Sequence, residues 1–319
     1  MNPIIKIFIE RFEKAMPNEF RAIQVKQNGK IWGEAFYDYK HTRIHSCSKS
    51  ITATAIGIAI GEGLLSLDDK VVNFFPELLP QKMDDKLCKL TLRHCLMMSS
   101  GHDYSSIPGG KLLDYEKPDW MEQYLSKPFY YEPGEHFHYE SGDSMTAAFM
   151  LNKKTGVSTL EYLRPRLFEP LGIEGVYAWQ TPDGFDQTAF GIHMKRGDLI
   201  KFAELYLNKG NWNGRQILSP EWTADATACH ISTDMPPGIT GDIPNFYGIQ
   251  CRPNYERYGY GYQIWRTRYD GFCANGGTGQ TLAIGLPKYN VCVYFSTHEQ
   301  PTYDLAIDLI WELILPHFA

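Results

Sequence analysis

The stretch Ile44–Ile60, IHSCSKSITATAIGIAI, decides the fold of this chain. Its polar opening, Ser-Cys-Ser-Lys, precedes a run of small and apolar residues, which predicts a buried helix with reactive groups at its N-terminus. Ser46 and Lys49 lie three positions apart, so on a helix they share one face, with Cβ atoms roughly 5–6 Å apart. The Lys49 amine can therefore reach the Ser46 hydroxyl.

A serine hydroxyl is a weak nucleophile until a neighbouring base takes its proton. An ammonium group cannot act as that base, so the site must lower the pKa of Lys49, and burial and the positive end of the helix dipole both act in this direction. The plainer interpretation makes Ser46 a helix N-cap and Lys49 a solvated first-turn residue. Small residues after Lys49 favour the first interpretation, because they let the helix be packed on all sides. They are Ala53, Ala55, Gly57, Ala59 and Gly61.

The composition excludes several classes of function. The chain has 319 residues, 43% of them hydrophobic, so it can bury a sizeable core and is neither disordered nor fibrous. A formal charge of −6 without a long basic run argues against nucleic acid or an anionic membrane surface as the main partner. No stretch approaches the ~18 apolar residues of a spanning helix, so we expect no stable membrane insertion. Small esters, amides or short peptides are the expected substrates, and no cofactor or metal is expected.

Seven cysteines form an odd set without a C-x-x-C pair and lie mostly inside apolar segments, as reduced, packed thiols do. The N-terminus lacks the apolar core and small-residue cleavage site of a signal peptide. These features favour the cytoplasm, although a secreted or periplasmic protein trimmed of its signal peptide would look the same. The sequence leaves the oligomeric state open.

The order of predicted elements indicates an α+β fold. Strands over Arg21–Gln27 and Lys30–Tyr37 flank Asn28-Gly29, which is the strongest short hairpin signal. From Tyr258 the hydrophobic period changes to two, which predicts three more strands, over residues 258–268, 271–287 and 290–298. We therefore predict one five-stranded antiparallel sheet flanked by N- and C-terminal helices, with an inserted, mainly helical lobe.

This architecture is expected to be a single unit of residues 1–319. Its α/β lobe is predicted to comprise residues 1–45 and 257–319, and its helical lobe residues 46–256. Residues 102–135 are rich in aromatic side chains and form either a wall of the substrate site or ordinary loop packing.

Three separated motifs follow one another along the chain: Ser46-x-x-Lys49, Tyr139-x-Ser141 and the glycine-rich segment 275–279. Together they resemble the serine β-lactamase and penicillin-binding-protein superfamily, and specifically its class C-like branch of carboxylesterases, D-aminopeptidases and 6-aminohexanoate-dimer hydrolases. The resemblance covers nearly the whole chain and implies the β-lactamase/transpeptidase-like fold. It extends, in the order of the family, to GEGLLSLDDKV, LTLRHCLMMSSG, YEPGEHFHYES, LFEPLGI, GNWNGRQILSPEW and YGYGYQIW.

The resemblance implies that Ser46 is the acylated nucleophile and Lys49 its activating partner. It also implies that the neighbouring ammonium lowers the pKa of Tyr139, which then passes a proton to the leaving group and later activates water. The oxyanion hole would use the backbone N–H of Ser46 and one N–H near Gly277.

Two departures from the family bear on the substrate. Ser141 stands where the family commonly has Asn, but its hydroxyl can still hydrogen-bond Lys49. The third motif commonly begins with Lys or His, whereas here that position is Ala274 or Asn275, so a cation for a substrate carboxylate is missing. With Ser141, the residues Asn275, Gly276 and Gly277 are expected to line the substrate.

We therefore predict a serine hydrolase that forms an acyl-enzyme on Ser46 and hydrolyses small esters or amides. A β-lactamase or a D-alanyl peptide hydrolase is the alternative, and Arg266 or Arg268 would supply the missing cation if either points into the cleft. A non-catalytic module that binds a peptide or another ligand on the same fold is the alternative from a different class.

Other chemistries have weaker support. No G-x-S-x-G motif is present, which argues against an α/β-hydrolase. His136-x-His138 is a candidate zinc pair without an implied third ligand. Cys47 is a candidate thiol nucleophile, but on a helix it points away from Lys49, so packing is expected.

Overall fold

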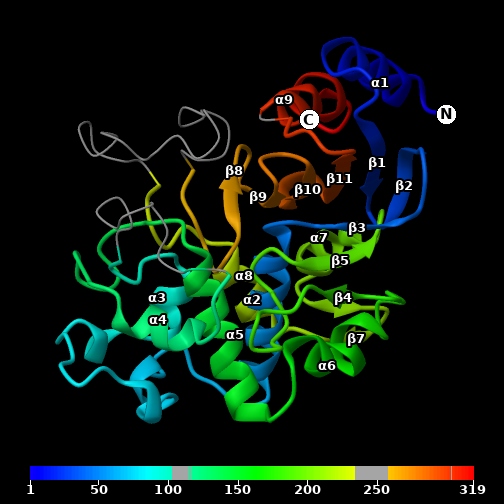
Figure 1. Ribbon diagram of the computed structural model, residues 1–319. Helices are drawn as coiled ribbons and strands as arrows, with labels where there is room; N and C mark the ends of the chain where they lie inside the picture. Colours follow the sequence, from blue (N-terminus) through cyan, green and yellow to red (C-terminus); the bar gives the residue numbers. More distant parts are fainter. Residues whose placement is uncertain (103–113, 115, 234–257, 303) are drawn as a thin grey trace.

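A computed structural model describes residues 1–102, 114, 116–233, 258–302 and 304–319 (Figure 1). The main sheet has six antiparallel strands in the order β2-β1-β11-β10-β9-β8. The strands are β1 (Phe20–Gln27), β2 (Lys30–Phe36), β8 (Trp265–Thr267), β9 (Gly271–Gly276), β10 (Thr281–Leu286) and β11 (Val291–Thr297). The predicted class, helices around one antiparallel sheet, is confirmed.

The predicted count of five strands is wrong. Residues 271–287, taken as one strand from the sequence, fold back on themselves into β9 and β10. The reversal lies at residues 277–280, where Gly277, Thr278 and Gly279 have φ values of 60°, 57° and 87°. Glycine adopts this region without steric cost, so the Gly-rich motif is the turn itself. The hairpin predicted at Asn28-Gly29 joins β1 to β2 as expected.

The two ends of the chain cover one face of the sheet (Figure 1). Helix α1 (Pro3–Ala15) packs beside α9 (Leu305–Leu309), which continues through η7 (Ile310–Ile314) and η8 (Leu315–His317). Phe8 and Phe12 of α1 contact Phe295 of β11 edge to face, with ring centres 5.8 Å and 5.1 Å apart. Arg11 and Glu312 form an ion pair between the two helical segments.

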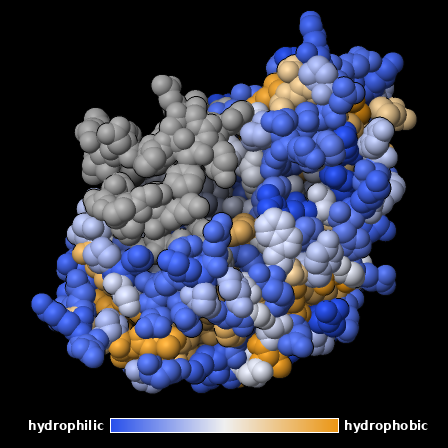
Figure 2. Space-filling view, viewed as in Figure 1, coloured by the Kyte–Doolittle hydropathy of each residue, from blue (hydrophilic) through white to orange (hydrophobic). Residues whose placement is uncertain are grey.

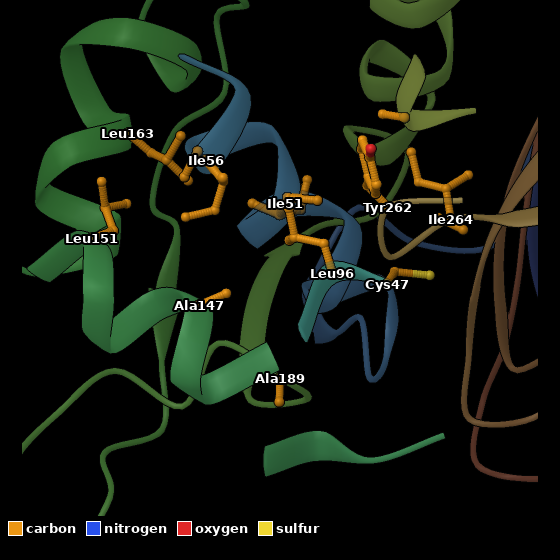
Figure 3. Packing of buried hydrophobic residues seen from close by; sticks show 14 of the residues in the cluster. Cys47, Ile51, Ile56, Leu96, Ala147, Leu151, Leu163, Ala189, Tyr262 and Ile264 are labelled. Atoms are coloured by element: carbon orange, nitrogen blue, oxygen red, sulfur yellow. The ribbon is translucent and has the colours of Figure 1, made fainter. Parts of the chain in front are cut away.

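The opposite face carries α2 (Cys47–Gly61) and α7 (Leu199–Leu207). Every α2 residue from Cys47 to Ala59 is buried, so the buried helix predicted from the sequence is confirmed. A Cβ at Gly57 would lie 2.2 Å from the indole nitrogen of Trp222, so only glycine fits there. Figure 3 shows α2 side chains such as Ile51 and Ile56 among those of the helices α5 (Ser141–Thr155) and α6 (Thr159–Leu163).

Shorter elements complete the fold. A small antiparallel sheet has the strand order β3-β5-β4. Its strand β3 is the element that comes directly before α2 in the chain. No helix in the described ranges is long and apolar enough to cross a bilayer. Hydrophilic side chains dominate the face of the molecule seen in Figure 2. The division into two lobes at residues 45 and 257 stays a prediction. The remaining elements are β3 (His41–Arg43), β4 (Tyr177–Ala178), β5 (Ile192–Lys195), β6 (Asn211–Trp212), β7 (Arg215–Gln216), α3 (Leu92–Leu96), α4 (Trp120–Ser126), α8 (Pro220–Ala226), η1 (Val71–Asn73), η2 (Pro76–Leu78), η3 (Leu87–Lys89), η5 (Arg164–Phe168) and η6 (Pro287–Tyr289).

Candidate active site

Ser46 stands at the junction between β3 and α2. A tight turn brings the chain there: His45 has φ 50°, and the Cys47 amide donates to the Ile44 carbonyl at 3.1 Å. Ser46 occupies the N-cap position of α2, yet its side chain makes no capping hydrogen bond. Its hydroxyl is therefore not committed to the helix end and is available to the groups around it.

Lys49 is buried directly beneath Ser46, with 1% of its surface exposed. Its Nζ lies 2.9 Å from the Ala189 carbonyl oxygen, 3.1 Å from Ser141 Oγ and 3.5 Å from Ser46 Oγ. Burial lowers the pKa of Lys49 to about 7, while the negative charge of Glu140 acts in the opposite direction. A large share of this group is thus a neutral amine near pH 7.

A neutral amine has two N–H donors and one lone pair. The Ala189 carbonyl only accepts, and it takes one N–H; Ser141 Oγ can accept the second. The lone pair is then left for the third and longest contact, at Ser46 Oγ. This arrangement orients Lys49 to receive the proton of the Ser46 hydroxyl.

Tyr139 approaches Ser46 from the segment before α5. Its hydroxyl is hydrogen-bonded to Ser46, and its ring stacks on Trp265 with centres 5.4 Å apart and an interplanar angle of 22°. The prediction of a lowered Tyr139 pKa is wrong. Burial raises the pKa of Tyr139, and the hydrogen bond from Ser46 opposes this only in part. The nearby Lys49 has lost much of its positive charge, so Tyr139 stays protonated and is a donor.

Strand β9 borders Ser46 on the sheet side. A Cβ at Gly276 would lie 2.3 Å from the Ile44 carbonyl oxygen, so β9 packs directly on the turn that presents Ser46. Ala274, two residues back, shares this side of the strand and the core of α2. Asn275 lies on the alternate side, where its Oδ1 accepts the Gly279 amide at 2.8 Å. Ala274 therefore takes the position that faces the helix, and the Asn275 side chain braces the turn.

Arg266 and Arg268, the two candidates for a substitute cation, leave the main chain at the other end of β9. Arg266 donates to the carbonyl oxygens of Thr227 at 2.9 Å and Asp270 at 3.2 Å. Arg268 begins the turn that leads to Gly271, the first residue of β9. Gly271 and Gly276 are five residues apart along a strand, or roughly 16 Å at ~3.3 Å per residue. Both arginines thus belong to the far end of β9.

Three other candidates have structural roles. Cys47 is fully buried and donates from Sγ to the Thr281 carbonyl at 3.4 Å, while burial raises its pKa. His136 packs against the Tyr131 ring at 4.1 Å, and the backbone amide of His138 donates to the Met98 carbonyl. Within the described ranges, no three His, Cys, Asp or Glu side chains form a possible metal site.

The aromatic stretch 102–135 divides between core and surface. Trp120, Tyr124 and Phe129 are buried in the main core, whereas Tyr130 is 44% exposed. Tyr104 lies outside the described residues. The aromatic side chains that contact the Tyr139 ring instead come from Phe137, Tyr260 and Trp265.

Two residues of the site, Ala189 and Trp265, were not predicted from the sequence. Ala189 acts through its backbone carbonyl, which any residue carries, and it is 140 positions from Lys49. Trp265 lies on β8, where alternation predicted a strand but no contact with Tyr139. In both cases only the folded chain brings the residue to the site.

A family model described as Beta-lactamase matches residues 25–314 of this chain. The chain is 30% identical over 148 residues to a lovastatin esterase of Penicillium rubens, which covers 40% of this chain and 37% of that protein. It is 25% identical over 251 residues to a D-aminopeptidase of Brucella anthropi. That alignment covers 71% of this chain and 44% of the aminopeptidase. The aligned region thus spans less than half the length of these curated relatives.

The fold recurs in solved structures. A chain from Bacteroides dorei, provisionally named a beta-lactamase, superimposes with a TM-score of 0.75 and 20% sequence identity. The alignment covers 98% of each chain. The β-lactamase/transpeptidase-like fold implied by the sequence motifs is therefore confirmed.

Proposed function

Because this chain belongs to the beta-lactamase family, we propose that it is a serine hydrolase that forms an acyl-enzyme on Ser46. The observation that carries the proposal is the buried Lys49, whose Nζ lies within 3.5 Å of Ser46 Oγ and whose pKa is lowered to about 7. The esterase and D-aminopeptidase relatives are consistent with acyl transfer at such a site.

In the proposed reaction the substrate carbonyl lies over Ser46, with its oxygen towards the backbone N–H groups of Ser46 and Gly277. Ser46 Oγ attacks the carbonyl carbon while Lys49 takes the hydroxyl proton, which gives a tetrahedral intermediate and an ammonium. Close packing of Gly276 on Ile44 supports this oxyanion site, because it holds the edge of β9 against the nucleophile turn.

Collapse of the intermediate breaks the bond to the leaving group, which needs a proton. Tyr139 is suited to give it, since its hydroxyl is protonated and touches Ser46, and the proton on Lys49 replaces it. A water molecule then attacks the acyl-enzyme with the same groups acting in reverse, which releases the acid and restores Ser46.

We propose neutral esters or amides as substrates rather than β-lactams or peptides with a free carboxylate. Ala274 offers no charge where a cation would hold a carboxylate, and Arg266 is bound to backbone carbonyls elsewhere. A charge-assisted hydrogen bond contributes roughly 1.5–3 kcal/mol, so its absence weakens recognition of an anionic substrate by about 10–150-fold.

The test compares kcat/KM for p-nitrophenyl butyrate and nitrocefin on one preparation, together with labelling by a fluorophosphonate probe. We expect the ester to be the better substrate, and peptide mapping to place the label on Ser46. A higher value for nitrocefin would favour the β-lactamase alternative. Absence of labelling on Ser46 would favour the non-catalytic binding module.

A further inference from the structure

Lys49 contacts the backbone carbonyl of Ala189. The path of the chain between β4 and β5 therefore sets the direction in which this carbonyl points. Residues 188–192 pass along α2 and are tied to it twice. Thr52 Oγ1 donates to the Thr188 carbonyl at 3.0 Å, and Ser48 Oγ accepts the Ile192 amide at 3.2 Å. Neither tie touches the peptide unit that faces Lys49.

That peptide unit is held by Gln187. Its Oε1 accepts the backbone N–H of Ala189 at 2.8 Å and that of Phe190 at 3.1 Å. With both amides directed at one oxygen, the Ala189 carbonyl turns the other way, towards Lys49 Nζ. The Gln187 side chain thus bridges two successive peptide groups and fixes the plane of the one that binds the amine.

The backbone of Gln187 is also fixed. Its amide donates to the Trp179 carbonyl at 2.8 Å, and its carbonyl accepts the Gly191 amide at 2.9 Å. A Cβ at Gly191 would lie 2.7 Å from that carbonyl oxygen, so the turn closes only around glycine. The acceptor Oε1 is therefore held by a rigid turn.

The two ends of the Gln187 amide differ: its Oε1 accepts two hydrogen bonds, whereas its Nε2 makes none within the described ranges. Gln187 is 3% exposed, so this donor is buried. A buried donor without a partner costs free energy. A methionine of similar size would fill the space without that cost, but it would leave the amides of Ala189 and Phe190 without their acceptor.

We infer that Gln187 is a positioning residue for the general base: it directs the Ala189 carbonyl at Lys49 and so leaves the amine lone pair facing Ser46. The inference rests on the proposed function. Without the Gln187 acceptor, the 189–190 peptide is free to rotate and the amine loses the partner that fixes its orientation.

The test uses Gln187→Met, which keeps the volume and removes the acceptor, and Gln187→Glu, which keeps an acceptor. Gln180→Met is the matched control, because Gln180 lies in the same β4–β5 connection and bonds Asp186 instead. The rates measured are Ser46 labelling by a fluorophosphonate and kcat/KM for p-nitrophenyl butyrate, from pH 6 to 9.5.

We expect Gln187→Met to lower both rates by about 10–100-fold, the usual effect of a small misplacement of a reacting group. Gln180→Met should leave them unchanged. Gln187→Glu should recover the rate at high pH, with the rising limb moved to higher pH because a carboxylate near Lys49 favours the ammonium. In a Lys49→Ala background, Gln187→Met should cause no further loss.

Wild-type rates in Gln187→Met would overturn the inference, as would an equal additional loss in the Lys49→Ala background, since a merely structural role acts without Lys49. If Gln187→Met does not fold, the Gln187→Glu variant decides: a pH–rate profile that rises at the same pH as that of the wild type would overturn the inference. If the wild-type protein is not labelled at Ser46, the proposed function itself is contradicted, and the role of Gln187 is contradicted with it.

Discussion

Lys49 Nζ lies over the Tyr139 ring, 5.1 Å from its centre. Both side chains also contact Ser46, Lys49 through its Nζ and Tyr139 through its hydroxyl. In the proposed reaction Lys49 accepts the proton of Ser46, and Tyr139 donates one to the leaving group. A single reaction cycle needs both transfers, which links the two residues functionally.

Lys49→Ala and Tyr139→Phe should each lower turnover of a neutral ester by ~10²–10⁴-fold, the usual contribution of general acid–base catalysis. The double variant should be little worse than either single one, because residues that act as a unit are not additive. Steady-state kinetics of the four proteins checks this. Losses that multiply would mean that the two residues act independently.

The activity should rise with pH around neutrality. Lys49 accepts a proton only as the amine, and burial lowers its pKa to about 7, so kcat/KM should increase through that pH and then level off. Because the pKa of Tyr139 is raised, its ionisation should not lower kcat/KM below pH 9. A profile for p-nitrophenyl butyrate from pH 5.5 to 9 measures this, and a flat profile would contradict the role of Lys49.

Asp143 should make the protein less stable as the pH rises. It is fully buried on α5, and burial raises its pKa to about 8, against the hydrogen bonds from Tyr124 and Ser100. The folded state then binds an extra proton between about pH 4, the pKa of an unperturbed Asp, and pH 8, so ionisation in this window opposes folding.

Asp143→Asn removes this ionisation and keeps an oxygen for the Tyr124 hydroxyl, which donates to Asp143 at 2.7 Å. Its free energy of unfolding relative to wild type should increase from pH 4 to pH 8. Urea denaturation at both pH values gives the difference, with the exposed Asp85→Asn as the control. A difference that does not change with pH would show that Asp143 does not titrate in this window.

Gly57→Ala should destabilise the protein by about 1–3 kcal/mol, the usual cost of overpacking. The added methyl group would overlap the Trp222 indole, which is itself held in the core between α2 and Tyr262. Gly61→Ala is the matched control on the same helix, since nothing lies within 4 Å of its added Cβ. It should stabilise by roughly 0.5–1 kcal/mol. Thermal denaturation compares the two, and equal effects would argue against close packing at Gly57.

The sequence predicted the parts of this fold that depend on local spacing. Ser46 and Lys49 meet because a helix brings residues three apart onto one face, and Asn28-Gly29 turns because its two residues accept positive φ. The strand count failed at residues 277–280, because alternation continues on both sides of this turn and the stretch 271–287 was counted as one strand although a glycine-rich turn was expected within it.

Other features needed the folded chain. The Tyr139 ring packs on Tyr260 and Trp265, which lie far along the chain, so its desolvation and the direction of its pKa shift were not predicted from the residues around it. The carbonyl of Ala189 and the amide oxygen of Gln187 carry no sequence signature, because backbone groups and a single buried Gln are common to all folds.

The pairing of α1 with the last helical segments brings both chain ends to the same region of the molecule, on the face of the sheet opposite α2 (Figure 1). The sheet itself separates these ends from Ser46. An affinity tag, a surface linker or a fused reporter at residue 1 or 319 is therefore attached on the side of the sheet away from Ser46.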